Sequence, residues 1–444
     1  MQVETLIHAR WVIPVTADTP VLENHSIAVQ DGRIAAVLPT EKAIGQISAA
    51  RTVNLPRHAL IPGLVNTHTH AAMSLFRGLG DDMPLMSWLN DHIWPAEAKW
   101  VHEEFVADGT RLAIAEMLRS GTTCFNDMYF FPDVTARVAQ GAGIRSVVGL
   151  ILIDFPSTWA SDANDYLSKA IEVHDQFRNE PLVSTAFAPH APYSVSDEPL
   201  SRMLTLDNEL EIPVHMHVHE TADEVQQGTQ SHGTRPLQRL KKLGLLNPSL
   251  VAVHMTQLTD EEITDFARSS AHVVHCPESN LKLASGFCPV QKLMDAGINV
   301  ALGTDSAASN NDLDMLGEMK TAALLGKGVA QDASALPAAK ILEMATINGA
   351  KALGLADRIG SLEPGKEADI TAIDLGQLNT QPVYNPVSQI VYAAGREQVS
   401  DVWVAGRRLL ANGQLSKMDM QAIATSTTRW HARITGKYPD GPPG

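Results

Sequence analysis

Two histidines with the spacing of metal ligands stand near the beginning of the chain. His68 and His70 are separated by one residue and follow an apolar run, residues 59–61, that predicts a strand. Side chains alternate across a strand, so both imidazoles would point to the same side. Two imidazoles over one interior point can bind a metal. Two solvated loop histidines would show the same spacing, so the pair alone does not establish a metal site.

Further side chains with metal-binding or acid–base chemistry follow apolar runs later in the chain. They are His217 with Glu220, then His254, then Asp305. Catalytic groups of a (β/α)8 barrel lie at the C-terminal ends of its strands, and these residues have that placement in chain order. A lone histidine on a strand is more often a packed core residue. The joint pattern therefore predicts one metal site inside a parallel barrel.

A metal held by imidazoles and a carboxylate would activate water. Such an ion, with one open position, lowers the pKa of its bound water toward ~7. Glu220 is out of phase with His217 on a strand, so we expect it beside the metal, where it can transfer protons. Asp305 can bind the metal and hydrogen-bond the water, and His254 can polarise the water or stabilise an oxyanion. As isolated residues, Glu220 and Asp305 would instead be interpreted as helix N-terminal acids.

Composition limits the classes of protein that need to be considered. The 444 residues are 44% hydrophobic, which is enough for a large core, and the formal charge of −16 disfavours nucleic-acid polymers and anionic membranes as partners. Three cysteines without a Cys-x-x-Cys pattern predict neither disulfides nor a thiolate zinc site. No signal peptide and no membrane-spanning run is recognised, so we expect a cytoplasmic protein. The oligomeric state stays open, a homo-oligomer included.

The pattern of strands and helices divides the chain into three segments. Residues 1–58 and 361–444 read as strands and turns, with a hairpin at Asp31-Gly32, and are expected to form one small β-sandwich domain with a C-terminal tail. Between them, in residues 59–360, strand-like and helix-like segments alternate, which predicts an α/β fold of the (β/α)8 TIM-barrel type. The clearest predicted helices are residues 103–120, 162–177 and 259–270.

Several motifs resemble the amidohydrolase superfamily, in its mononuclear adenosine-deaminase-like branch. They are residues 62–77, 217–220, 275–282 and 303–306. More narrowly, nearly the whole chain is similar to the 5-methylthioadenosine/S-adenosylhomocysteine deaminases. The resemblance implies one Zn²⁺ per chain, with Fe²⁺ or Mn²⁺ as alternatives. It also implies that the metal ligands are His68, His70, His217 and Asp305, and that Glu220, His254 and Asp305 carry the hydrolysis.

The same resemblance suggests how many metals and which substrate contacts to expect. Binuclear members of the superfamily use a carboxylated lysine on the fourth strand, and residues 184–190 contain no lysine, which favours a single metal. Family members contact the purine through a histidine that matches His190, and hold the ribose hydroxyls through a glutamate that matches Glu97. Glu220 and Asp305 are expected to touch the substrate as well. Taken alone, His190 would orient a loop and Glu97 would be a solvated helix residue.

The implied reaction is hydrolysis of the 6-amino group of 5′-methylthioadenosine, with S-adenosylhomocysteine and adenosine as further candidate substrates. The apolar residues 83–89 could close over a methylthio group. Some relatives hold the homocysteine carboxylate with two arginines. Arg145 is a candidate for the first, although its role stays open. Residues 150–160 contain no second, which places S-adenosylhomocysteine in doubt.

Other functions share part of this pattern. Deaminases of guanine, 8-oxopurines or cytosine and triazine hydrolases have the same metal motifs and stay as alternatives. A catalytically dead barrel scaffold would have lost a metal or proton-transfer residue, and none is missing. The chain lacks the His-x-Glu and Pro-Cys-x-x-Cys motifs of the nucleobase-editing deaminases, which excludes that fold.

Overall fold

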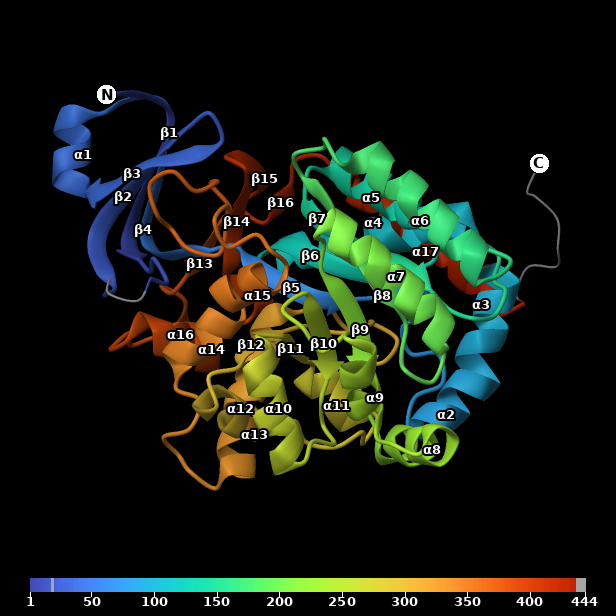
Figure 1. Cartoon of the computed structure of the whole chain (residues 1–444). Helices are drawn as coiled ribbons and strands as arrows, with labels where there is room; N and C mark the ends of the chain where they lie inside the picture. Colours follow the sequence, from blue (N-terminus) through green and yellow to red (C-terminus); the bar gives the residue numbers. More distant parts are fainter. Residues whose placement is uncertain (17–19, 437–444) are drawn as a thin grey trace, which may run out of the picture.

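The computed structural model describes residues 1–16 and 20–436. Two eight-stranded sheets organise this part of the chain (Figure 1). One sheet is parallel and forms the barrel, and the other joins strands from both ends of the chain. The predicted (β/α)8 barrel with a small domain built by the two terminal segments is therefore confirmed.

The barrel strands are paired in the order in which they occur in the sequence. They are β5 (Leu64–Thr69), β6 (Thr122–Tyr129), β7 (Arg145–Leu152), β8 (Val183–Pro189), β9 (Val214–Val218), β10 (Leu250–His254), β11 (His272–His275) and β12 (Asn299–Leu302). Hydrogen bonds beyond the end of β12 join it to β5. The backbone N–H of Asp305 donates to the carbonyl of His68 at 3.0 Å, and the N–H of Thr304 donates to Oδ1 of Asn66 at 3.0 Å. These bonds connect the first and last strands where the site lies.

Helices connect successive barrel strands and cover the outside of the barrel (Figure 1). The helices are α4 (Glu103–Arg119), α5 (Pro132–Ala142), α6 (Ala163–Phe177), α7 (Asp197–Leu210), α8 (Ala222–His232), α9 (Pro236–Leu243), α10 (Asp260–Ser269), α11 (Pro277–Lys282), α12 (Val290–Asp295), α13 (Met315–Ala330), α14 (Ala338–Met344) and α15 (Ile347–Ala352). The three helices predicted most clearly, α4, α6 and α10, each begin and end within one residue of the prediction. The starts of α6 and α10 are readable because polar side chains cap them: Asp162 accepts two backbone N–H groups of α6, and Thr259 forms a capping box with Glu262 on α10.

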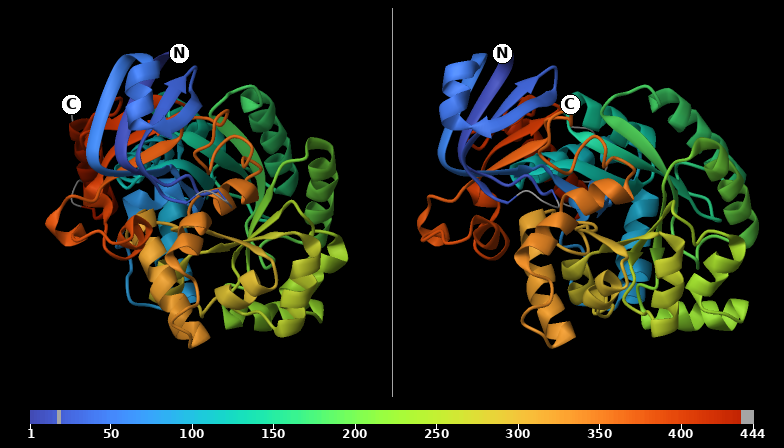
Figure 2. Two further views of the ribbon diagram at one scale, coloured as in Figure 1. Left: turned by 90° about the vertical axis from the view of Figure 1, so that its left-hand side faces the viewer. Right: turned by 60° about the vertical axis from the view of Figure 1, so that its left-hand side comes forward.

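The second sheet contains strands from both ends of the chain, which lie side by side in Figure 2. Its order is β16 (Gln414–Leu415), β15 (Arg407–Ala411), β14 (Val399–Val404), β13 (Ile370–Asp374), β4 (Ser48–Pro62), β1 (Gln2–Val12), β2 (Leu22–Gln30) and β3 (Arg33–Pro39), with α1 (Thr40–Gln46) after β3. Asp31 and Gly32 form the turn between β2 and β3, as predicted, with φ of 51° and 74°. Ile7, Ile27 and Trp403 are buried in the core of this domain.

The strand that carries His68 is not the one that the sequence indicated. The apolar residues 59–61 end β4 in the second sheet, where Ala59 pairs with Trp11 and Ile373, so β4 crosses the boundary expected at residue 58. β4 ends at Pro62, and after the single residue Gly63 the first barrel strand, β5, begins at Leu64. A Cβ at Gly63 would lie 2.1 Å from Oγ1 of Thr123, so the chain passes between the sheets without room for a side chain. β5 is buried throughout although its second half is polar, which is why no apolar run marks it.

The C-terminal segment returns to the barrel after the second sheet. It contains α16 (Pro386–Tyr392) and ends in α17 (Met420–Ile434), which lies beside α4 (Figure 1). Trp430 of α17 is buried, and its indole N–H donates to the Asp108 carboxylate at 3.0 Å. This segment therefore adds a helix to the outer layer of the barrel as well as strands to the small domain. None of the described helices is both long and apolar enough to cross a membrane.

Candidate active site

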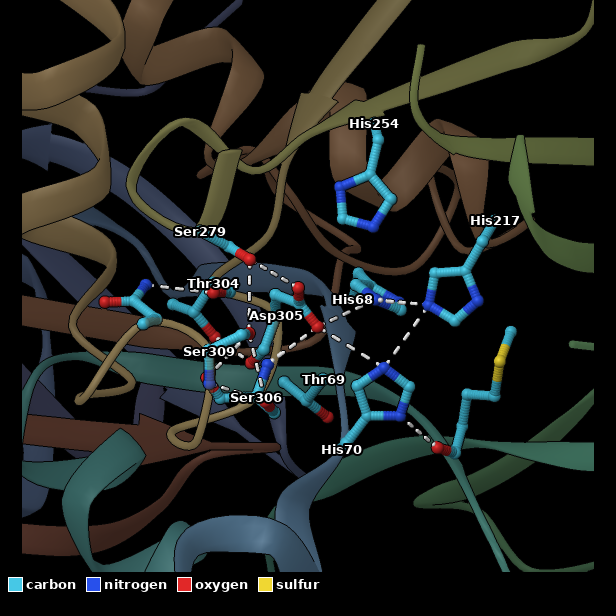
Figure 3. A network of polar contacts seen from close by, with 12 residues as sticks. His68, Thr69, His70, His217, His254, Ser279, Thr304, Asp305, Ser306 and Ser309 are labelled. Atoms are coloured by element: carbon cyan, nitrogen blue, oxygen red, sulfur yellow. Dashed lines mark hydrogen bonds and ion pairs between the residues drawn. The ribbon is translucent and has the colours of Figure 1, made fainter. Parts of the chain in front are cut away.

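The four predicted metal ligands come together at the C-terminal ends of β5, β9 and β12 (Figure 3). Nε2 of His217 lies 3.2 Å from Nε2 of His68 and 3.3 Å from Nε2 of His70. Oδ1 of Asp305 lies 3.2 Å from Nε2 of His68 and 3.3 Å from Nε2 of His70. All four ligand atoms are within 4.8 Å of one another. The fold thus places residues from distant parts of the chain around one point.

Hydrogen bonds at the outer ring nitrogens determine which nitrogens face this point. Nδ1 of His70 lies 2.5 Å from the carbonyl oxygen of Met128, and Nδ1 of His217 lies 2.7 Å from the carbonyl oxygen of His190. A carbonyl only accepts, so each Nδ1 carries the hydrogen and, in the neutral ring, each Nε2 is a bare lone pair. Burial holds the pKa of His217 well below its usual value, which keeps that ring neutral. Bare nitrogens this close to each other repel unless a cation lies between them.

The spacing and the donor types fit a divalent metal. Tetrahedral zinc with bonds of 2.0–2.1 Å separates its ligand atoms by about 3.3 Å, close to the distances in this cluster. The Asp305 carboxylate is fixed in place: Oδ2 accepts the Ser279 hydroxyl at 2.6 Å, and Oδ1 accepts the backbone N–H of Ser306 at 2.8 Å. Nδ1 of His68 is 2.8 Å from Nε2 of His215. Each ligand is therefore oriented before a metal binds.

Glu220 and His254 lie next to the four ligands. β9 ends at Val218, so Glu220 stands in the turn after the strand. Its Oε2 is 3.8 Å from Nε2 of His254, and its Oε1 is 3.5 Å from the Ser285 hydroxyl. Burial raises the pKa of the Glu220 carboxyl, although attraction to His254 partly offsets this. Nδ1 of His254 lies 2.8 Å from Oδ1 of Asn280, which accepts its hydrogen, so Nε2 of the neutral ring is left to accept.

A cavity of about 290 Å³ opens beside the cluster. The catalytic, metal-binding and substrate-binding residues predicted from the sequence line it, with one exception: His68 lies behind them. The lining residues among them are His70, Glu97, His190, His217, Glu220, His254 and Asp305. Leu85 and Trp88 of α2 (Leu85–Trp88) and Leu89 of the following π-helical turn η2 (Leu89–Ile93) add apolar walls from the stretch that was expected to close over the substrate.

Glu97 and His190 come from two different segments of the chain, and both line the cavity. Glu97 lies on α3 (Trp94–Trp100), and its Oε1 accepts the Tyr129 hydroxyl at 2.8 Å, so one carboxylate oxygen is already engaged. Burial raises the pKa of Glu97 to about 7, against the effect of that hydrogen bond. His190 follows β8, and burial lowers its pKa to about 3, so the ring is neutral. Both side chains are therefore available to hydrogen-bond a neutral ligand.

Arg145 is far from its expected place. It begins β7, at the N-terminal end of the barrel, whereas the cavity is at the C-terminal end. Its guanidinium donates to both oxygens of Asp369 at 3.0 Å and to Glu367 at 2.6 Å, and the residue is 1% exposed. Arg145, whose role the sequence leaves open, is therefore not in a position to hold a substrate carboxylate. Among the described residues, no lysine or arginine lines the cavity.

Several residues that shape the site were not recognised in the sequence. They are Tyr129, Ser279, Asn280 and Glu224. Ser279 and Asn280 lie within the motif at residues 275–282. Because that motif accompanies the metal motifs in the chain, both residues could have been predicted to lie near the metal site. Tyr129 has no such motif, because Glu97 becomes its neighbour only when the chain folds. Glu224 is close to its partners in the sequence, but an acid near the start of a helix gives no sign that it bonds back to the preceding turn.

A parallel barrel with a buried cluster of three histidines and one aspartate at its strand ends is the architecture of a hydrolase with a divalent-metal site. A match to the Amidohydrolase family covers residues 59–409. The chain belongs to this family and, within it, to the 5-methylthioadenosine/S-adenosylhomocysteine deaminases.

Three similar proteins illustrate this membership. A 5-methylthioadenosine/S-adenosylhomocysteine deaminase of Saccharophagus degradans is 50% identical and matches 99% of this chain and 98% of its own length. A 5′-deoxyadenosine deaminase of Methanothermobacter thermautotrophicus is 42% identical and matches 95% of this chain and 98% of its own. A crystal structure of an adenosine deaminase from Xanthomonas campestris with bound zinc is 54% identical, with a TM-score of 0.97 over 98% of this chain and 99% of that one.

Proposed function

We propose that this protein is a zinc-dependent hydrolytic deaminase that replaces the 6-amino group of 5′-methylthioadenosine with oxygen and releases ammonia. The observation that carries the proposal is the arrangement of three groups around one cavity. Bare histidine nitrogens converge with Asp305, the buried acid Glu220 adjoins them, and Glu97 supplies a second carboxylate suited to a ribose. The similarity to adenosine-type deaminases supports the choice of C6 as the reacting atom.

His68, His70, His217 and Asp305 would hold one divalent ion, and zinc is supported by the zinc-bound relative. When bound, the ion supplies an acidified water as the nucleophile. A single ion is favoured because β8 contains no lysine that could bridge a second one.

Glu220 would move the proton that the reaction needs. Its carboxylate takes a proton from the attacking water and delivers it to N1 of the purine, which makes C6 a better electrophile. Burial raises the pKa of Glu220, which favours its protonated form relative to an exposed glutamate and suits a group that must both take up and release a proton. His254 accepts a hydrogen bond from the water through Nε2 and orients it. The oxygen bonds to C6 to give a tetrahedral centre. The proton left on that oxygen then passes to the amino group, and the C6–N bond breaks as C6=O forms and ammonia leaves.

The remaining cavity residues would select the substrate. Glu97 accepts the ribose hydroxyls, and His190 contacts the purine ring. An uncharged 5′ group is favoured over the homocysteine of S-adenosylhomocysteine, because Arg145 lies at the other end of the barrel, where it is bound to Asp369. We therefore propose 5′-methylthioadenosine as the preferred substrate, with adenosine also accepted.

A side-by-side assay with metal analysis tests this function. Adenosine, 5′-methylthioadenosine, S-adenosylhomocysteine, guanine and cytosine are supplied to one preparation whose metal content is measured. We expect the highest kcat/KM for 5′-methylthioadenosine, a lower value for S-adenosylhomocysteine, and one zinc per chain. Guanine or cytosine as the best substrate would refute the nucleoside assignment, and two metals per active chain would refute the single-ion site.

A further inference from the structure

The turn that carries Glu220 is held by a second buried glutamate. Glu224 lies in the first turn of α8, with its side chain directed back toward the end of β9. Its Oε1 accepts the backbone N–H of His219 at 3.0 Å, and its Oε2 accepts the backbone N–H of Glu220 at 2.6 Å. The residue is 5% exposed. Both oxygens of one carboxylate thus bind two consecutive peptide groups.

The same turn is held from the opposite side by Thr256. The Thr256 hydroxyl donates to the carbonyl of Glu220 at 2.7 Å, and the Thr256 backbone N–H donates to the carbonyl of His219 at 3.0 Å. His219 has a φ of 54°, in the left-handed region that a residue with a side chain rarely adopts. Such a conformation persists when its surroundings hold it. Here, hydrogen bonds hold both the N–H and the carbonyl groups of the turn.

The side chain of Glu220 itself is held far less tightly. Its carboxylate has contacts of 3.5 Å to Ser285 and 3.8 Å to His254, both longer than the hydrogen bonds to its backbone. Its direction into the cavity is therefore set mainly through the backbone. We propose that Glu224 is a positioning residue for catalysis: it fixes the His219–Glu220 turn so that the Glu220 carboxylate faces the reacting atoms.

A glutamate suits this role because two N–H donors need two acceptor oxygens. Glutamine has nearly the same shape but offers one oxygen and one NH₂ group, and the NH₂ group cannot accept. One backbone N–H would then face another donor, and the turn would have to shift. A displacement of about 1 Å of a catalytic group can reduce the rate by about 10²-fold.

The inference rests on the proposed role of Glu220 and is tested on the zinc-loaded enzyme with 5′-methylthioadenosine. For Glu224→Gln we expect kcat to fall by about 10- to 100-fold while KM changes less than about threefold, with unchanged zinc content. Thr256→Val, which removes the hydroxyl on the other side of the turn, should give a smaller loss of the same kind. The matched control is Asp223→Asn, because Asp223 is the neighbouring acid on α8 and is exposed, and it should behave like the wild type. A Glu224→Gln enzyme with wild-type kcat, or one that has lost its zinc, would overturn the inference.

A double-mutant cycle separates positioning from a general structural effect. If Glu224 acts through Glu220, adding Glu224→Gln to Glu220→Gln should leave the residual turnover unchanged, because the group being positioned is already absent. A further loss equal to that of the single Glu224→Gln variant would mean that Glu224 acts elsewhere, and would overturn the inference. Wild-type turnover in the single Glu220→Gln variant would instead refute the proposed role of Glu220, and the inference with it.

Discussion

Buried charged side chains lie at both ends of the barrel, but they are balanced differently. At the N-terminal end, Arg145 is matched by Asp369 and Glu367, so donors meet acceptors throughout. At the C-terminal end, Nε2 of His70 and Nε2 of His217 converge with Oδ1 of Asp305, while backbone carbonyls hold the Nδ1 atoms of both rings. Burying charges is costly unless they are paired, and a buried carboxylate surrounded by imidazole nitrogens is a set of groups that suits a divalent cation.

The comparison shows how a structural charge cluster and a functional one can be told apart. Both clusters are buried, and both join segments far apart in the sequence. In the cluster around Arg145 each charged group has a partner, and the cluster links β7 of the barrel to the residues just before β13 of the small domain. The cluster around Asp305 has the composition of a metal-ligand set and borders a cavity. Changes at the two ends should therefore affect different properties of the protein.

The largest effect is expected for removal of a metal ligand. His68→Ala should lose the zinc and reduce turnover to background, because one of four ligand atoms is gone. His272→Ala is the matched control, since this histidine lies on β11 and bonds to Asn299 instead of the cluster. Zinc content and kcat/KM are measured for both variants. Full activity in His68→Ala would remove this residue from the metal site.

The next effect is on proton transfer. Glu220→Gln should keep the zinc and the fold but lose ~10²–10⁴-fold in kcat, because an amide cannot take the water's proton and pass it to N1. Metal content, thermal midpoint and kcat are compared with those of Asp223→Asn. Retention of more than about a tenth of the wild-type turnover would reassign Glu220 as a helix-terminal acid.

At the other end of the barrel the expected effect is on stability. Arg145→Met leaves Asp369 and Glu367 buried without their cation, which should lower the free energy of unfolding by about 3–5 kcal/mol. Arg178→Met is the control. Arg178 pairs with Asp175 at the surface, with both side chains more than half exposed, and should change stability by about 0–1 kcal/mol.

Denaturant unfolding measures both arginine variants, and substrate preference is measured on the folded fraction. The ratio of kcat/KM for 5′-methylthioadenosine to that for S-adenosylhomocysteine should be unchanged in Arg145→Met. A selective loss of S-adenosylhomocysteine activity would return Arg145 to substrate binding and would break the contrast between the two ends.

The smallest of these effects is expected at Glu97. Glu97→Ala leaves the ribose hydroxyls without their acceptor, which costs about 1–3 kcal/mol, so kcat/KM for 5′-methylthioadenosine should fall ~5- to 150-fold. Adenine has no ribose and should be affected far less. Equal losses on nucleoside and free base would show that Glu97 acts through folding and that the ribose binds elsewhere.

The two ends of the barrel also differ in how far their residues could be placed from the sequence. The metal ligands are marked by local spacing, as in His68 and His70, and by their place after apolar strands, which together indicate one end of a barrel. Arg145 has no comparable signal. A residue at the start of a strand and one at its end can be few positions apart, and only the fold shows that they lie at opposite ends of the barrel.

Other features required the folded chain for physical reasons. β5 is buried between neighbouring strands although its second half is polar, because Asn66 and Thr304 satisfy each other across the barrel closure. The hydroxyl of Tyr129 meets Glu97 only when the helical segment before α4 packs over the strand ends. In the sequence, Glu224 is one of several acidic residues near the start of a helix. Its hydrogen bonds to the preceding turn are visible only in the structure.

The central claim is hydrolytic removal of the 6-amino group, and an isotope experiment tests it most directly. The zinc-loaded protein is incubated with 5′-methylthioadenosine in H₂¹⁸O, the nucleoside is analysed by mass spectrometry, and ammonia is measured in the same sample. The account predicts an intact nucleoside that carries one ¹⁸O as the oxygen on C6 of the purine, and one ammonia per product. Release of free adenine, or recovery of unchanged 5′-methylthioadenosine from fully metal-loaded protein, would contradict it.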